Sequence, residues 1–449
     1  MRPTSMFLVA AVFAIAGSAI AESLAPPKPG DEWQLTTTIY ANELHQRMSL
    51  RIEKGKVSGW IFQGGKRVPL TGTSDAGGLR FETKDGEEKT VYVGRFDGDE
   101  LSGTATSTDP DDWAESAPSA WRARRTIPES DGPAASRTID FEPLEFHRTF
   151  SASTPPALRI RPGDVVRTKT VDAGGVDDRG KTRVLGGNPQ TGPFYVAGAM
   201  PGDVIAIHIR RLRLNRATAI SDDGLVDRAI TQDYAGEHRD NDFKNVVWSL
   251  DPEKGVASPA KPPENLKSLV VAIRPMLGCV GVAPGFGGAA IRTGDSGRFG
   301  GNMDFNEIRE GATVYLGVAQ PGALLYIGDG HALQGDGELN GNALETSLDV
   351  EFSVDVIREK RISGPRVENA EYLMAMGLSG SLDDAFREAG SALAEWLQQD
   401  YKLTGRETAI LLGATIEYQI VEVADRNVGV AAKIRKKYLP PAIAAAGSK

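Results

Sequence analysis

Residues 294–345 contain twelve glycines, and the acidic side chains of this stretch stand mostly at glycine turns rather than along a helix face. Glycine allows backbone conformations with φ > 0 and close approach to a ligand, so several turns can direct side chains to one point. Two apolar runs between the turns, residues 313–318 and 323–327, are typical of buried strands. The pattern predicts a rigid β framework whose turns carry a functional site.

The densest part of this stretch is residues 328–338, which read Gly-Asp-Gly-His-Ala-Leu-Gln-Gly-Asp-Gly-Glu. Three carboxylates and one imidazole fall within these eleven residues. The chain has neither a GxSxG nucleophile elbow nor an HExxH motif. These residue types instead suit a metal ion bound by one His and two carboxylates, with a coordination position left open.

Several motifs here resemble the acetamidase/formamidase family. They are Phe-Gly-Gly-Asn-Met-Asp at 299–304, Pro-Gly-Ala-Leu-Leu-Tyr-Ile-Gly-Asp-Gly-His at 321–331 and Gln-Gly-Asp-Gly-Glu at 334–338. Upstream, Asn-Pro-Gln-Thr-Gly-Pro-Phe at 188–194 and Gly-Ala-Met-Pro-Gly-Asp at 198–203 resemble an earlier motif of the same family. The resemblance runs in order from about residue 145 to about residue 440. It implies a hydrolase that cleaves short amides to a carboxylate and ammonia.

One position departs from the family pattern. Phe299 stands where many members have His, directly before Gly-Gly-Asn. Phe299 is therefore a candidate substrate contact at which this chain differs from its relatives. The departure motivates two alternatives, which are a catalytically altered or non-catalytic amide-binding protein on the same scaffold, and a hydrolase of a larger or cyclic amide.

The candidate metal ligands are Asp304, Asp329, His331, Glu345 and Asp172. Zinc is the first choice because imidazole with carboxylate suits it, whereas calcium prefers more oxygen ligands and no His. Glu345 is alternatively a residue that supports the ligands. Asp172 matches the family's first acidic position, but an Asp before a glycine turn is equally typical of a residue that bonds its own backbone. Both interpretations of Asp172 stay open.

The remaining site residues have predicted catalytic roles. Glu338 is the candidate general base, which takes a proton from water and passes it to the departing ammonia. Asn302 and the backbone amides of Gly300 and Gly301 are candidates to hold the carbonyl oxygen as it gains charge. Gln334 is expected to position the substrate.

The N-terminus predicts export. Arg2 precedes an apolar run at residues 6–15, and Ala-Ile-Ala follows at 19–21. This arrangement is typical of a signal peptide (residues 1–21) cleaved after residue 21, so we expect a secreted or periplasmic protein. Since no second long apolar run follows, we expect no membrane span after cleavage.

The rest of the chain predicts two domains. Residues 31–127 form a small accessory β domain, a meander or barrel, because short β-prone runs alternate with turn dipeptides such as Lys-Gly and Asp-Gly. Residues 128–137 are small and polar and predict a linker. Residues 138–449 form the acetamidase/formamidase-like catalytic domain.

The catalytic domain is predicted to be mainly β, a sandwich or barrel, with a helical excursion near its C-terminus. Apolar residues recur at helical spacing after Ser381 up to about residue 399, and Thr404 and Glu407 form a capping box for a second helix. Residues 416–423 then return as a strand.

Composition excludes some functions. The formal net charge is -9 and no basic run occurs, which argues against nucleic acid as a partner. The single Cys279 excludes an internal disulfide and stands in an apolar run, so we expect it to be buried and inert. A small amide is the expected partner, and the oligomeric state, including a homo-oligomer, is left open.

Overall fold

The computed structural model describes residues 32–75, 78–98, 100–109, 116–126, 136–238, 243–285 and 287–441. The expected signal peptide and residues 128–135 of the expected linker lie outside these ranges. The chain divides after residue 131 into two compact units. Each unit has its own hydrophobic core.

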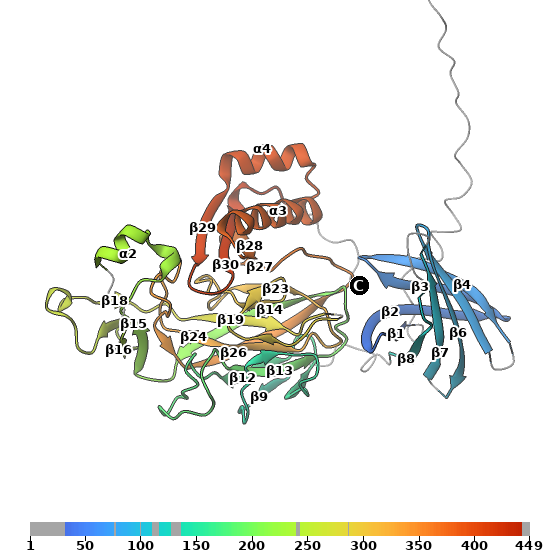
Figure 1. Ribbon diagram of the computed structural model, residues 1–449, viewed down its shortest axis with the longest axis horizontal. Coiled ribbons are helices and arrows are strands. Elements are labelled where there is room, and N and C mark those ends of the chain that lie inside the picture. The colour runs from blue at the N-terminus through green and yellow to red at the C-terminus, as the bar shows by residue number, and fades with distance from the viewer. Residues whose placement is uncertain are drawn as a thin grey trace, which may run out of the picture. The chain divides into compact units, whose positions relative to one another are not determined.

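The first unit is a closed barrel of antiparallel strands, drawn in blue in Figure 1. Pairing of the first strand with the last closes it. The strands are β1 (Glu32–Ile39), β2 (Asn42–Glu53), β3 (Lys56–Gln63), β4 (Lys66–Ser74), β5 (Gly78–Asp85), β6 (Glu88–Asp97), β7 (Glu100–Thr108) and β8 (Ser119–Arg125).

The barrel interior is filled by alternate residues of each strand, as the two-residue period of a strand requires. Leu35, Ile61, Phe81 and Trp121 belong to this one buried cluster. The N-terminal prediction is therefore confirmed in its barrel form.

The second unit contains two large sheets. The first has nine strands, in the order β29 (Glu417–Glu422), β30 (Val428–Arg435), β28 (Tyr372–Ser379), β27 (Arg366–Glu368), β23 (Thr313–Gly317), β14 (Val204–Leu214), β26 (Leu348–Ile357), β12 (Val165–Lys169) and β9 (Thr138–Asp140).

The second sheet has eleven strands. Its main path is β18 (Val271–Ala272), β17 (Val256–Pro259), β16 (Asn245–Asp251), β15 (Thr218–Asp222), β25 (Glu345–Thr346), β24 (Leu325–His331), β19 (Met276–Val282), β22 (Gly300–Asn302) and β21 (Ser296–Gly297). β13 (Gln190–Val196) joins through β24 and carries β11 (Leu158–Ile160). A separate pair is β10 (Thr149–Phe150) with β20 (Ile291–Arg292).

The main core lies between these two sheets. Ile207 and Phe352 of the nine-stranded sheet share one buried cluster with Val280 and Ile327 of the eleven-stranded sheet. The unit is thus a β-sandwich, which confirms the predicted fold class.

Helices are few among the described residues: α2 (Gln232–His238), α3 (Leu382–Tyr401), α4 (Gly405–Thr415) and three short 3-10 turns at Asp227–Ala229, Glu264–Leu266 and Lys436–Tyr438. Ser381 caps α3 by accepting the Asp384 N–H, and Thr404 with Glu407 forms the predicted capping box of α4. The apolar stripe of α3 packs on β28 and β30, as Figure 1 shows, so the C-terminal helical excursion is confirmed.

Two predicted turns are strands instead. The run expected to end at residue 327 continues as β24 through His331. Gly300 and Gly301, expected in a turn, lie in β22, which pairs with β19 on one side and β21 on the other. Gly300, Gly301, Asp329 and His331 are therefore built into the sheet.

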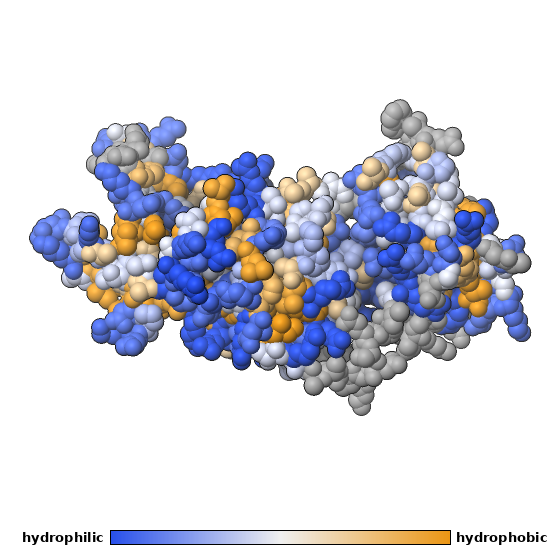
Figure 2. Space-filling model, turned by 90° about the horizontal axis from the view of Figure 1, so that it is seen from below, coloured by the Kyte–Doolittle hydropathy of each residue, from blue (hydrophilic) through white to orange (hydrophobic). Residues whose placement is uncertain are grey.

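No helix in the described ranges is long and apolar enough to cross a membrane. Figure 2 shows one face of the molecule, on which hydrophilic residues surround several separate hydrophobic patches.

Candidate active site

The site is built on two neighbouring strands of the eleven-stranded sheet. Asp329 and His331 stand two residues apart on β24, so a strand directs their side chains to the same face. Gly278 of β19 lies at the level of Asp329, because the flanking residues of the two strands pair in regular register. A Cβ added at Gly278 would lie 2.4 Å from both Asp304 Oδ1 and Asp329 Oδ2. The glycine therefore leaves open the space toward which these carboxylates point.

Three further acids reach the same space from other segments. Asp304 follows β22, and its backbone N–H donates to Gly278 O over 3.0 Å. Glu345 begins β25 and pairs directly with His331 in the sheet register. Glu338 lies in the loop after β24, where its Oε1 accepts the backbone N–H of Ala343 at 2.9 Å.

The imidazole of His331 is the centre of this cluster. Its Nε2 lies 3.2 Å from Glu345 Oε1, 3.4 Å from Asp329 Oδ2 and 3.9 Å from Asp304 Oδ1. Despite the short distances, Nε2 has no hydrogen bond of acceptable geometry with any described residue. A cation at Nε2, whether a proton or a metal ion, would be surrounded by carboxylate oxygens.

Gln334 fixes the orientation of this ring. Its Nε2 donates to the backbone carbonyls of Asp304 and Val421, which leaves Oε1 to face His331 Nδ1 at 3.0 Å. An amide oxygen only accepts, so Nδ1 carries the proton and donates to Gln334. In the neutral ring Nε2 then holds the free lone pair, which is the tautomer that a metal ligand bound through Nε2 requires.

The backbone is strained at the cluster. Asp304, Asp329 and Glu338 have φ of 44°, 58° and 48°, and Asn188 nearby has 54°. Positive φ is uncommon outside glycine and clusters at functional sites, where the surrounding structure holds it in place. The positive φ values place the carboxylates where a regular strand or turn would not.

The charges of the cluster are not balanced by the protein. Burial raises the pKa of Asp304 and of Glu338 well above its ordinary value, and the nearby Asp329 carboxylate acts in the same direction on both. Burial raises the pKa of Glu345 to about 7, which His331 opposes. Burial lowers the pKa of His331, but Glu345 and Asp329 outweigh it and the net shift is upward. Buried carboxylates in such numbers are stabilised by a positive counter-charge.

The side chains present fit a metal ion. Four buried atoms lack a hydrogen-bond partner among the described residues, namely Asp304 Oδ1, Asp329 Oδ1, His331 Nε2 and Glu345 Oε2. Two sets of ligand atoms lie within 4.8 Å of one another, Asp304 with His331 and Glu338, and Asp329 with His331 and Glu345. Unsatisfied buried donors and acceptors are costly, so a buried cluster that holds four of them is an observation that a cation would explain.

Asp172 is not brought into these sets. Its Oδ2 accepts a hydrogen bond from Arg216 Nη2 at 2.7 Å, and its Oδ1 accepts the backbone N–H of Val176 at 2.8 Å. Arg216 also donates to the backbone carbonyl of Glu345. The structure thus places Asp172 as a turn residue in a buried ion pair that supports the strand carrying Glu345.

The groups predicted to hold the carbonyl oxygen of the substrate are not free to do so in the structure. Asn302 Nδ2 already donates to Asp304 Oδ2 and to Asp425 Oδ2, each at 2.6 Å. Gly300 and Gly301 belong to the sheet pairing of β22 rather than to a free turn. Phe299 packs against Phe150, with ring centroids 5.3 Å apart. Asn302 therefore positions acids, and Phe299 lies in an apolar contact.

Two site residues carried no assignment from the sequence. Asn188 Nδ2 donates to Asn302 Oδ1 at 2.8 Å and approaches Asp329 Oδ2 at 3.4 Å. Asn188 is the first residue of the motif at 188–194, so the family resemblance of that motif could have pointed to Asn188 as a site residue. Asp425 lies in the turn between β29 and β30, where a polar residue is ordinary. Burial raises the pKa of Asp425 to about 6, while the hydrogen bond from Asn302 acts against this shift.

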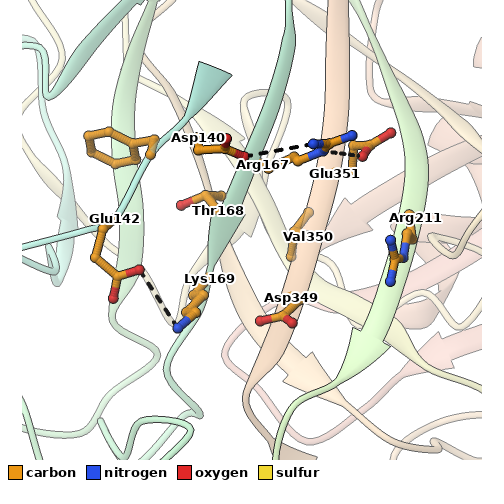
Figure 3. Close-up of a pocket in the computed structure, with 10 residues that line it drawn as sticks. Asp140, Glu142, Arg167, Thr168, Lys169, Arg211, Asp349, Val350 and Glu351 are labelled. Carbon is orange, nitrogen blue, oxygen red and sulfur yellow. Dashed lines mark hydrogen bonds and ion pairs between the residues drawn. The ribbon is translucent and has the colours of Figure 1, made fainter. Parts of the chain in front are cut away.

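A separate cavity of about 300 Å³ lies on the nine-stranded sheet, and Figure 3 shows its lining. Five of its charged residues pair with one another: Arg167 with Glu351 at 2.8 Å and Asp140 at 3.9 Å, and Lys169 with Glu142 at 3.7 Å. Such exposed pairs are typical of a solvated sheet face. None of the residues of the acidic cluster lines this cavity.

Comparison with known proteins covers the residues of this cluster. The model of the acetamidase/formamidase family matches residues 285–398, which include Asp304, Asp329, His331, Glu338 and Glu345. No curated protein sequence matches the chain.

Solved structures resemble about two thirds of the chain. A predicted acetamidase/formamidase from the thermophile Thermoanaerobacter tengcongensis is 28% identical, with a TM-score of 0.58 over 68% of this chain and 97% of that one. An acetamidase from Yersinia enterocolitica is 29% identical, with a TM-score of 0.59 over 68% and 94%. An acetamidase from Bacillus halodurans is 25% identical, with a TM-score of 0.57 over 67% and 98%. The family match over the acidic cluster and these structural matches show that this part of the chain is similar to the acetamidase/formamidase family.

Proposed function

We propose that this chain is an exported amidohydrolase that cleaves the C–N bond of short amides, such as formamide and acetamide, with the help of a divalent metal ion. The match to the family model and the similarity to solved acetamidases support the reaction class. One geometric observation supports the metal: Nε2 of His331 lies 3.4 Å from a carboxylate oxygen of Asp329 and 3.2 Å from one of Glu345, in a buried space. Each of these three side chains has a polar atom without a partner among the described residues.

His331, Asp329 and Glu345 are the residues proposed to hold the ion, with Asp304 next to them. One imidazole with two or three carboxylates favours zinc over calcium. When bound, the ion supplies a Lewis acid that polarises the amide carbonyl and lowers the pKa of a water molecule.

Glu338 is proposed as the general base. Ala343 holds one oxygen of its carboxylate. As water attacks the carbonyl carbon, Glu338 takes one of its protons, and it returns that proton to the amide nitrogen as the C–N bond breaks. The products are a carboxylic acid and ammonia. Gln334 and Asn302 act as positioning residues, because their hydrogen bonds are made to His331 and to acids of the cluster.

The non-catalytic alternative rests on Phe299, and the structure gives it little support. Phe299 packs on Phe150 and belongs to neither set of candidate metal ligands. The replacement of the family's frequent His thus leaves the proposed ligands in place. A larger or cyclic amide as substrate is tested directly by including small lactams.

The test is ammonia release by the purified mature protein with formamide, acetamide and small lactams, before and after chelator treatment. The proposal expects ammonia release that a chelator removes and added zinc restores. Activity that survives removal of all bound metal would refute the role of the metal ion. No ammonia release from any of these amides would refute the hydrolase activity.

Export is tested separately by intact mass of the protein recovered from the producing cells. Cleavage after residue 21 predicts a chain that begins at residue 22 and is found outside the cytoplasm. A chain that keeps residues 1–21 in the cytoplasm would contradict export without affecting the proposed reaction.

A further inference from the structure

Asp425 reaches the acidic cluster from a distant part of the chain. It stands in the turn between β29 and β30, at the edge of the nine-stranded sheet. Its Oδ2 accepts a hydrogen bond from Asn302 Nδ2 at 2.6 Å. The same nitrogen donates to Asp304 Oδ2 at 2.6 Å, so the two carboxylates flank one amide group.

Asp425 differs from the other acids in exposure. Asp304, Asp329, Glu338 and Glu345 are all buried, with at most 7% of each residue exposed. Asp425 is only partly buried. Asp425 is therefore the partly exposed member of this group of acids, bonded through Asn302 to the buried Asp304.

The turn that carries Asp425 is held on several sides. Arg228 donates to the backbone carbonyls of Asp425 and Arg426. Asn427 Nδ2 donates to Ser296 O at 2.6 Å, and the Asp425 N–H donates to the buried Glu422 Oε2 at 3.0 Å. Anchoring by three separate segments keeps the carboxylate in place, which is the requirement for a group that recognises a ligand.

The chemistry of the carboxylate suggests its use. An ionised carboxylate only accepts hydrogen bonds, and Asn302 occupies one of its two oxygens. A primary amide brings two N–H donors on the atom that must leave. The second oxygen of Asp425 is the remaining acceptor on this partly exposed side chain.

We propose that Asp425 is a specificity-determining residue, whose carboxylate accepts a hydrogen bond from the substrate's amide nitrogen and so favours amides that carry an N–H. This inference rests on the proposed function, since it assigns a role in that same site. It extends the site from the glycine-rich stretch to the C-terminal hairpin.

The test compares Asp425→Asn with wild type in the full chain. The Asn oxygen can still accept from Asn302, so the local network stays, but its amide group presents donors where the carboxylate presented an acceptor. The matched control is Asp295→Asn, which removes a neighbouring charge whose carboxylate faces Arg426 at 3.8 Å. For each protein, kcat and KM for acetamide are measured, together with inhibition by N,N-dimethylacetamide, which has the same acyl group and no N–H. Bound zinc is measured in parallel.

Loss of one hydrogen bond to a charged group predicts that Asp425→Asn lowers kcat/KM for acetamide by about 10- to 100-fold. Asp295→Asn should stay near wild type, and zinc content and inhibition by N,N-dimethylacetamide should be unchanged in both. Wild-type kinetics in Asp425→Asn would overturn the inference while leaving the proposed function standing. Loss of zinc, or weaker inhibition by N,N-dimethylacetamide to the same extent, would also overturn it by showing a merely structural role. An inactive wild type would instead overturn the proposed function.

Discussion

Gln334 and His331 form a hydrogen-bonded pair in which the amide sets the tautomer of the imidazole, with 3.0 Å between Oε1 and Nδ1. The amide cannot rotate freely, because its Nε2 is held by the carbonyls of Asp304 and Val421. Through this pair, the end of β24, the loop that follows it and β29 are all linked to one ring nitrogen of His331.

Gln334→Leu should lower the affinity for zinc without leaving a cavity at the buried position of Gln334. The ring of His331 would lose its acceptor at Nδ1, and loss of such an outer partner typically costs about 10- to 100-fold in metal affinity. Zinc affinity measured by competition with a chelator checks this. Gln399→Leu, which removes an amide that bonds Arg366 instead, is the control and should bind zinc as wild type does. Equal zinc affinity in wild type and Gln334→Leu would refute the role.

Gly278→Ala should fill the space between the carboxylates. Its Cβ would lie 2.4 Å from Asp304 Oδ1 and Asp329 Oδ2, so both side chains must move. We expect loss of bound zinc and a decrease of about 1 to 3 kcal/mol in the free energy of unfolding. Gly335→Ala is the matched control, because nothing lies within 4 Å of its added Cβ. A zinc content in Gly278→Ala equal to that of the control would show that the space is not used.

Glu338→Gln should abolish turnover and leave the fold intact. Removing a general base lowers kcat by about 10²- to 10⁴-fold, while the zinc content should stay at the wild-type level. Ammonia release and metal analysis on the same sample separate the two effects. Glu264→Gln, in the exposed turn Glu264–Leu266, is the control. Retained ammonia release would remove Glu338 from the mechanism.

The lowered pKa of Asp164, which lies outside the candidate site, predicts that the free energy of unfolding depends on pH. Burial acts to raise the pKa of Asp164, but hydrogen bonds from Arg137 and from the backbone N–H of Arg161 outweigh it and hold the pKa below its ordinary value. A lowered folded pKa stabilises the protein above the unfolded value, about 3.9, and this contribution disappears as pH falls through the folded value.

Asp164→Asn should therefore lower the free energy of unfolding by about 1 to 3 kcal/mol at pH 7, and the difference from wild type should shrink below about pH 4. Denaturant unfolding at a series of pH values measures it. Asp140→Asn on the exposed β9 is the control, since its ion pair with Arg167 spans 3.9 Å at the surface. A difference that is constant with pH would contradict the assignment.

The sequence predicted the kind of fold well, because strand periodicity and turn dipeptides are local. Six barrel strands were visible as β-prone runs. β4 and β8 were not predicted, since β4 contains Pro69 and Gly72, and β8 reads Ser-Ala-Trp-Arg-Ala-Arg-Arg. In these strands, pairing within a closed barrel overrides weak local propensity.

The site was predictable in its residue types and less so in its geometry. Asp329 and His331 lie on one strand rather than in a turn, because sheet pairing with β19 extends β24 through the glycines. Asp425 and Asn188 are each more than a hundred residues away from Asn302 in the sequence. No local sequence pattern could predict that they contact it. Asp172 was ambiguous for a physical reason, since an Asp before glycines serves turns and ligands alike.

The most direct test of the central claim is metal analysis of the purified full chain beside His331→Ala, with ammonia release measured on the same samples. We expect about one zinc ion per wild-type chain, loss of most of it in the variant, and loss of acetamide hydrolysis in proportion. A wild-type chain that hydrolyses acetamide without bound metal, or a variant that keeps both zinc and activity, would contradict it.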